Sequence, residues 1–184
     1  MVALALTSCL PPAADGSPEL VQITVLYTND EHGWIAADNR RGGAAGMLTR
    51  WREQEGYTDD GPFLVLSGGD LWTGPALSTW FDGEPAVDVM NVMGYDAAVI
   101  GNHEFDFGRE GLRLRGDQAE FAFLGANALD ASSGAPIDEV LPYVIEEVAG
   151  VQVGIIGLAS RRTPQTTMPT HVAGIEFVDY DRTL

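Results

Sequence analysis

The sequence predicts an α/β fold, with a β-α-β-α-β first half followed by antiparallel strands. Short apolar, β-branched runs alternate with segments of helical periodicity up to about residue 124. Beyond that point, two apolar runs flank Ala149-Gly150, a pair of residues typical of a hairpin turn. Apolar residues make up 45% of the 184-residue chain, which is enough for one globular core.

The expected elements follow from local patterns. The alternating, β-branched run over residues 21–27 predicts a strand, and shorter wholly apolar runs predict strands buried on both faces. Between these strands, apolar residues at helical spacing predict helices. The expected strands are 21–27, 63–66, 97–100, 121–124, 143–148, 151–158 and one within 172–180, and the expected helices are 44–54, 84–93 and 108–118. In the first half, this order favours a parallel sheet with helices on its faces.

Composition excludes several classes of function. The chain has 27 acidic and 10 basic residues, a formal net charge of −17. A general DNA or RNA binder needs a basic face, so no nucleic-acid polymer is expected as a partner. A polybasic membrane-surface protein is equally disfavoured. The single cysteine allows neither an internal disulfide framework nor a cysteine metal site, and no apolar run is long enough for a transmembrane helix.

Residues 1–20 are expected to be a signal-like segment and a flexible tether. Residues 1–6 are apolar, and residues 6–9 (LTSC) resemble a bacterial lipobox, in which the cysteine becomes lipidated. A stretch rich in proline and glycine follows Cys9. This interpretation predicts an extracytoplasmic location with a possible lipid anchor. Because the basic start of a signal peptide is missing, a tail with an incidental cysteine remains the alternative.

Residues that can bind metal follow three consecutive predicted strands. Asp30 and His32 follow the first strand, and Asp70 follows the second. Asn102 and His103 follow the third. Ligands of open α/β sheets bind outside the carboxyl ends of the strands, so these residues are expected at one edge.

Each residue type at this edge suits a divalent cation. Spacing by two would place the side chains of Asp30 and His32 on one side of an extended chain. Oxygen and nitrogen ligands without thiolate suit Zn, Mn or Fe(II) better than Ca. Two such ions about 3.5–4 Å apart would form a clamp for phosphoryl transfer. The sequence therefore predicts a divalent metal site.

The three motifs, D-x-H, G-G-D and G-N-H-E in this order, resemble those of the calcineurin-like metallophosphoesterases. The longer strings over residues 27–33 and 101–108 resemble the bacterial 5′-nucleotidase family, which includes UDP-sugar hydrolases and 2′,3′-cyclic-nucleotide phosphodiesterases. The resemblance runs from about residue 21 onward. It implies that residues 21–184 are the N-terminal part of a catalytic domain with an α/β/β/α sandwich, without the C-terminal substrate domain.

The resemblance also implies a ligand set for two divalent metal ions. Asp30 and His32 would bind the first ion, Asp70 would bridge both, and Asn102 would bind the second. The implied activity is hydrolysis of small phosphate esters, with nucleotides as the expected substrates, by a metal-bound hydroxide.

His103 has a different implied role. It would not be a ligand; it would stabilise the phosphoryl group and the leaving group, and Asp106 would orient it and stabilise its charge. Asn102 and His103 would thus also contact substrate. The family's further histidine motifs have no match here, so the resemblance predicts that these 184 residues alone are inactive.

Two other functions stay open. One is a sulfur-ester hydrolase of the related thiosulfate-oxidation branch, and the other is a non-enzymatic truncated domain. The sequence leaves the physiological substrate, the metal and the oligomeric state undetermined.

Several other residues have ordinary structural interpretations. His171 is expected to be an exposed loop residue, and Arg40 and Arg41 a solvated surface pair. Trp34, Trp72 and Trp80 are expected to pack in the core. Asn127 is equally compatible with a place beside the active site and with a structural role.

Overall fold

The structure, a computed structural model, describes residues 2–7 and 20–183, with side chains from residue 20 onward. Cys9 and the predicted tether that follows it lie outside the described residues. None of the described helices has the length and apolar character that crossing a bilayer requires.

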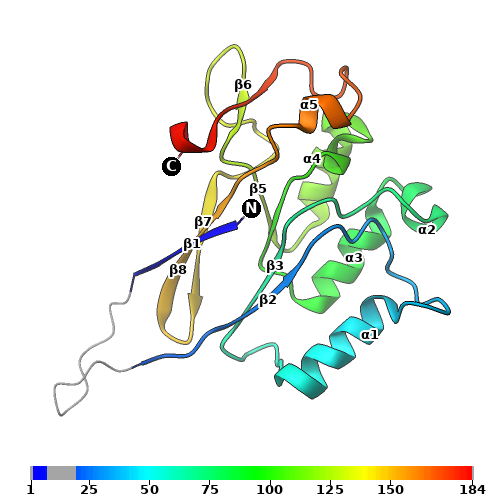
Figure 1. Ribbon diagram of the computed structural model, residues 1–184, viewed down its shortest axis with the longest axis vertical. Helices are drawn as coiled ribbons and strands as arrows, with labels where there is room; N and C mark the ends of the chain where they lie inside the picture. The colour runs from blue at the N-terminus through cyan, green and yellow to red at the C-terminus, as the bar shows by residue number, and fades with distance from the viewer. Residues whose placement is uncertain (1, 8–19, 184) are drawn as a thin grey trace.

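A four-stranded parallel sheet forms the centre of the protein (Figure 1). Its strands lie side by side in the order of the sequence: β2 (Thr24–Thr28), β3 (Phe63–Ser67), β4 (Ala97–Val99) and β5 (Ala122–Leu124). Every strand predicted for the first half is present, although β2 begins three residues later than the predicted residue 21. The predicted parallel pairing is confirmed.

Helices cover one face of this sheet (Figure 1). The connecting helices are α1 (Gly43–Arg50), which continues as a π-helical turn over Trp51–Glu55, α3 (Glu84–Met93) and α4 (Gly108–Gln118). α3 has the predicted bounds, with a proline in its first turn and Gly94 closing it in the left-handed conformation. The one-turn helix α2 (Ala76–Thr79) was not predicted.

A second, antiparallel sheet covers the other face. It consists of β1 (Val2–Thr7), β8 (Val151–Gly157) and β7 (Tyr143–Val148), in that order. β7 and β8 form the predicted hairpin, and both turn residues, Ala149 and Gly150, have positive φ. That combination suits the twist of a tight hairpin.

The rest of the chain forms short elements near one end of the two sheets. A two-stranded sheet pairs β6 (Ala128–Asp130) with β9 (Ile175–Phe177), and the latter lies within the predicted 172–180 segment. The remaining elements are α5 (Thr163–Thr166) and the 3₁₀ turns His103–Phe105 and Tyr180–Arg182.

Alternation along β3 builds two cores. Leu64 and Leu66 pack against Val153 and Ile155 of the antiparallel sheet, whereas Val65 faces the helices. All five side chains are at most 1% exposed. A strand buried on both faces explains why this segment is wholly apolar. The layers confirm the predicted α/β fold class.

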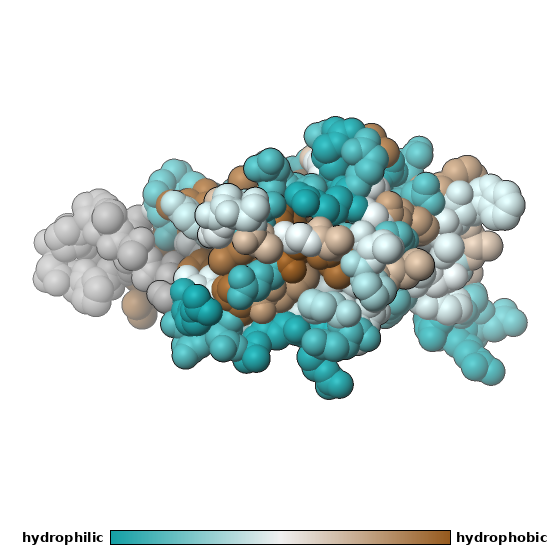
Figure 2. All heavy atoms as spheres, turned by 90° about the horizontal axis from the view of Figure 1, so that it is seen from above, coloured by the Kyte–Doolittle hydropathy of each residue, from teal (hydrophilic) through white to brown (hydrophobic). Residues whose placement is uncertain are grey.

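The acidic surplus lies at the surface. Among the described residues, Glu104 is the only buried acidic side chain. Seen from above, hydrophilic residues border both long margins of the molecule, and hydrophobic atoms show between them (Figure 2).

Candidate metal centre

The loops that follow β2 and β3 run side by side. The N–H of Asp30 donates to the carbonyl of Gly69 at 3.1 Å, and the N–H of His32 donates to the carbonyl of Asp70 at 2.9 Å. These bonds extend the pairing of the two strands beyond their ends. They hold the predicted D-x-H segment against the predicted G-G-D segment.

Three predicted ligands have a strained backbone. Asp30, His32 and Asp70 have φ values of 56°, 45° and 59°, in the left-handed region that residues other than glycine rarely adopt. The assumption of an extended chain at Asp30 and His32 is therefore wrong, because the main-chain bonds to the neighbouring loop turn this segment. Such strain costs about 1–3 kcal/mol per residue and persists where the surrounding structure imposes it, often at functional sites.

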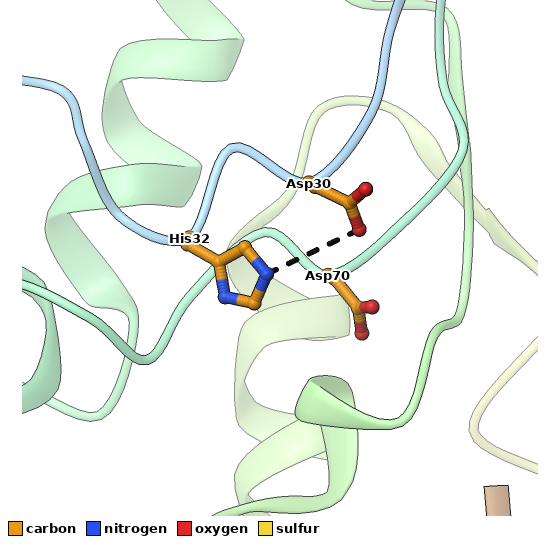
Figure 3. A group of neighbouring side chains, drawn as sticks. All are labelled: Asp30, His32 and Asp70. Atoms are coloured by element: carbon orange, nitrogen blue, oxygen red, sulfur yellow. Dashed lines mark ion pairs between the residues drawn. The ribbon is translucent and has the colours of Figure 1, made fainter.

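The three side chains converge, as Figure 3 shows. One ligand atom from each of Asp30, His32 and Asp70 lies within 4.8 Å of the others, and the Asp30 carboxylate is 4.0 Å from Nε2 of His32. Between residues 20 and 183, no other group of three histidine, cysteine or acidic side chains meets this criterion. No arginine in that range forms an ion pair with either aspartate. Two carboxylates and an imidazole without a cationic partner fit a divalent ion.

The third loop brings His103 to the same place. The main-chain N–H of His103 donates to Oδ1 of Asp70 at 2.9 Å, and the rings of His103 and His32 are 4.6 Å apart. Asn102 begins this loop, but its side-chain amide donates to the carbonyl of Thr166 at 3.3 Å. The role of Asn102 as a ligand stays a prediction.

His103 is paired with Asp106, the predicted partner. Nδ1 of the ring is 2.6 Å from Oδ2 of Asp106, which leaves Nε2 as the outer nitrogen. Partial burial on its own would lower the pKa of His103. The hydrogen bond to Asp106 and the negative charges of Asp106, Asp70 and Glu104 outweigh burial and raise this pKa. The arrangement favours a protonated ring.

Glu104 links the second and third loops. Its fully buried carboxylate accepts the main-chain N–H groups of Asp70 at 2.9 Å, Leu71 at 2.8 Å and Gly101 at 2.5 Å. Burial and the nearby charge of Asp70 raise its pKa to about 7. From the sequence, Glu104 is expected either to support the site or to be solvated; its three donors could not be predicted, because they come together only in the folded chain.

Two glycines allow the loops to approach closely. Gly69 has a φ of 97°, and a Cβ atom there would overlap the main chain at Val99 and Gly101. A Cβ atom at Gly101 would overlap the carboxylate of Asp70. The motif glycines therefore provide space for the site.

Three expectations outside the cluster need correction. His171 is half-buried, not exposed, because its ring nitrogen Nδ1 lies 2.8 Å from the carbonyl of Phe105. Trp34 and Trp80 are 43% and 82% exposed, so only Trp72 belongs to the core. Trp80 closes the one-turn helix α2, which the sequence did not predict.

Asn127 has a structural role. It is buried, and its amide group donates to the carbonyls of Ala159 and Val178 and accepts the N–H of Ala159. These bonds attach the loop before β6 to the segment after β8 and to the C-terminal region.

Comparison with known proteins identifies relatives. No family model matches the chain. The chain is 36% identical over 163 residues to the 5′-nucleotidase of Vibrio cholerae, a match that covers 86% of this chain and 29% of that protein. It therefore spans less than a third of the length of this relative.

Solved structures share the fold. The NAD nucleotidase of Haemophilus influenzae has a TM-score of 0.71 and 27% identity, covering 89% of this chain and 30% of that one. The sulfate thiohydrolase SoxB of Thermus thermophilus has a TM-score of 0.67 and 22% identity, covering 96% and 41%. Similarity to SoxB at this identity shows the fold alone. The calcineurin-like phosphoesterase YfkN of Bacillus subtilis shares the fold, with a TM-score of 0.68 and 23% identity. The sequence and fold together show that this chain belongs to the 5′-nucleotidase family.

Proposed function

We propose that the protein to which this chain belongs hydrolyses phosphate esters, with nucleotides as the first substrates to test. The observation that carries the proposal is the convergence of Asp30, His32, Asp70 and His103 at one edge of the sheet. Relatives with this fold are named nucleotidases, which favours a phosphate ester of a nucleoside.

Asp30, His32 and Asp70 would hold a first divalent ion, and Asn102 would join Asp70 in holding a second. Ions at such a site lower the pKa of coordinated water and offset negative charge on a phosphoryl group. Asp70 comes from the middle of the three loops. Its Oδ1 already accepts the N–H of His103, so its position is fixed before any ion binds.

His103 supplies a proton at a defined atom. Asp106 engages Nδ1, so a protonated ring presents Nε2–H outward. A hydrogen bond from Nε2 would stabilise negative charge on a phosphoryl oxygen or on the leaving oxygen. Asp106 keeps the ring oriented and favours its cationic form.

The sulfur-ester alternative has weaker support. SoxB shares the fold at 22% identity, whereas the relative with 36% identity is a nucleotidase. A non-enzymatic role is the outcome expected if no divalent ion binds.

The proposal extends to the parts of the protein that the structure does not describe. We propose that residues 21–184 are the N-terminal part of the catalytic domain and that the protein acts outside the cytoplasmic membrane, with Cys9 as its lipid attachment site. Incorporation of labelled palmitate into the full-length protein, compared with Cys9→Ser, tests the anchor. Equal labelling of both proteins would contradict it.

The function is tested by measuring metal content and hydrolysis on the same preparations. The full-length protein with Mn²⁺ should release phosphate from AMP, whereas the 184-residue chain should release little or none. His103→Asn should keep its Mn²⁺ and lose about 10²–10⁴-fold in rate. Loss of Mn²⁺ in step with rate would refute the assigned role of His103. Faster hydrolysis of a thiosulfate ester than of AMP would favour the alternative.

A further inference from the structure

A cleft of about 810 Å³ lies between α1, α3 and the loop after β2. Its apolar walls include Met47 of α1 and Val89, Met90 and Met93 of α3. The volume falls in the usual range for small-molecule sites, and methionine walls adapt to ligands of varied shape. The cleft could therefore hold an apolar body of moderate size.

The cleft adjoins the metal centre and shares part of its lining with it. Asp30 and His32 line one end, whereas Asp70 and His103 do not line it. Tyr95 also belongs to the lining, and its hydroxyl is 2.8 Å from the hydroxyl of Thr28. The cleft thus runs from the D-x-H loop into the helix layer.

Two arginines line the cleft, and neither has a carboxylate within ion-pair distance among residues 20–183. These are Arg41 and Arg50. Five other arginines in that range form ion pairs, whereas Arg40, Arg162 and Arg182 form none within it. Arg41 and Arg50 differ from these three because they line an apolar cleft.

Arg41 is positioned by an aromatic ring. Its guanidinium group stacks over the ring of Trp34 at 4.0 Å, and Trp34 also lines the cleft. Stacking orients a planar cation and leaves its N–H groups available in the plane. Arg40 and Arg41 are both exposed, as predicted, and the contact with Trp34 additionally orients Arg41.

We propose that the cleft binds a small organic anion, with its aromatic or aliphatic body against the methionines and its acid group at Arg41, while Arg50 adds positive charge to the same lining. The complementary charge of the arginines selects an anion over a neutral or cationic ligand. Asp30 and Glu31 also line the cleft, so the acid group is expected at the arginines and not at these carboxylates. This site does not depend on metal binding or hydrolysis.

Gly46 offers a way to fill the cleft. It lines the cavity, and a Cβ atom built there has no neighbour within 4 Å. Because Gly46 lies within α1, replacing it also favours the helix. Gly46→Phe should occupy the cleft, and Gly46→Ala is the matched control that leaves it open.

The probe is 8-anilinonaphthalene-1-sulfonate, titrated by fluorescence into EDTA-treated chain. Wild type and Gly46→Ala should bind it at one saturable site, whereas Gly46→Phe should bind at least tenfold more weakly. The double variant Arg41→Gln/Arg50→Gln should bind at least fivefold more weakly and should show no preference for the sulfonate over neutral N-phenyl-1-naphthylamine. Thermal melts of all four proteins show whether each is folded.

Two results would overturn the proposal. One is equal affinity of Gly46→Phe and Gly46→Ala for the probe, and the other is unchanged sulfonate affinity when both arginines are replaced. The arginine variant keeps the test decisive if Gly46→Phe does not fold. Mn²⁺ titration of the same variants separates the two sites. If the chain binds the probe but not Mn²⁺, the proposed hydrolytic function is contradicted and the proposed anion site is not. If it binds Mn²⁺ but not the probe, only the anion site is contradicted.

Discussion

The two ends of the parallel sheet are built from the same strands but use polar side chains differently. At the amino end, the carboxylate of Asp96 accepts the N–H of Val65 at 2.7 Å, so the fold itself satisfies this group. At the carboxyl end, Asp30, His32 and Asp70 converge on a strained backbone without an arginine partner in the described chain. One end therefore stabilises the fold, whereas the other end is available to a ligand.

Of the variants considered, Gly69→Ala should destabilise the loops at the carboxyl end of the sheet most. The new Cβ atom would overlap main-chain atoms of Val99 and Gly101, and the positive φ adds strain. We expect a loss of more than about 2 kcal/mol in the free energy of unfolding, measured by urea denaturation. Gly134→Ala is the control, because its φ is also positive but nothing lies near its Cβ. Equal losses in the two variants would show that close approach at Gly69 is not required.

Glu104→Gln should destabilise the carboxyl end of the sheet less than Gly69→Ala does. An amide keeps one oxygen acceptor but places its NH₂ group against the N–H of Leu71 or against those of Asp70 and Gly101, which then lose their acceptor. We expect a loss of about 1–3 kcal/mol in the free energy of unfolding and weaker Mn²⁺ binding, because Asp70 is held by this contact. The control is Glu147→Gln on exposed β7, which should change neither quantity. An unchanged Glu104→Gln variant would contradict the linking role.

Asp70→Asn should separate stability from metal binding. Removing one of two neighbouring negative charges relieves repulsion, so the metal-free protein should melt at the same temperature or slightly higher. Affinity for Mn²⁺ should fall at least tenfold, about 1.4 kcal/mol, as measured by isothermal titration calorimetry. A variant that melts lower and binds Mn²⁺ normally would place Asp70 in a purely structural role.

Asp96→Asn tests the amino end and should have the smallest effect. Burial raises the pKa of Asp96 above its ordinary value of 3.8, despite the hydrogen bond from Val65. A raised carboxyl pKa favours folding of the protonated form, so its contribution to stability is present below pH 3.8 and is lost as pH rises through the folded-state value. Asp96→Asn should therefore match wild type at pH 3 and be equally or more stable at pH 8 in urea denaturation. Greater instability of the variant at pH 8 than at pH 3 would contradict this.

The regular elements were predictable because each depends on its own residues. The apolar run of β3, the helical spacing of α3 and the Ala149-Gly150 turn all specify local structure without help from distant segments. The order of the motifs also placed Asp30, His32, Asp70 and His103 at one edge of the sheet, since the carboxyl ends of parallel strands meet there.

The remainder depends on tertiary contacts that no local pattern encodes. The left-handed backbone at Asp30 results from bonds to the neighbouring loop, and Glu104 finds its three donors only after β3 and β4 have paired. Likewise, the pairing of residues 2–7 with β8 depends on a free strand edge far along the chain. The exposure of Trp80 could not be predicted, because α2, which it closes, has too few residues to show a helical period in the sequence.

The parallel order of the strands also constrains how the chain folds. The hairpin of β7 and β8 joins neighbouring segments, and such hairpins close within about 1–10 μs. Pairing of β2 with β3 instead brings Val25 to Leu64 across a whole helical crossover, a closure that is slower because of its length. The metal ligands of the first two loops meet only after this step. A divalent ion that requires both loops would therefore bind only after β2 and β3 have paired, and its binding rate during refolding would report that step.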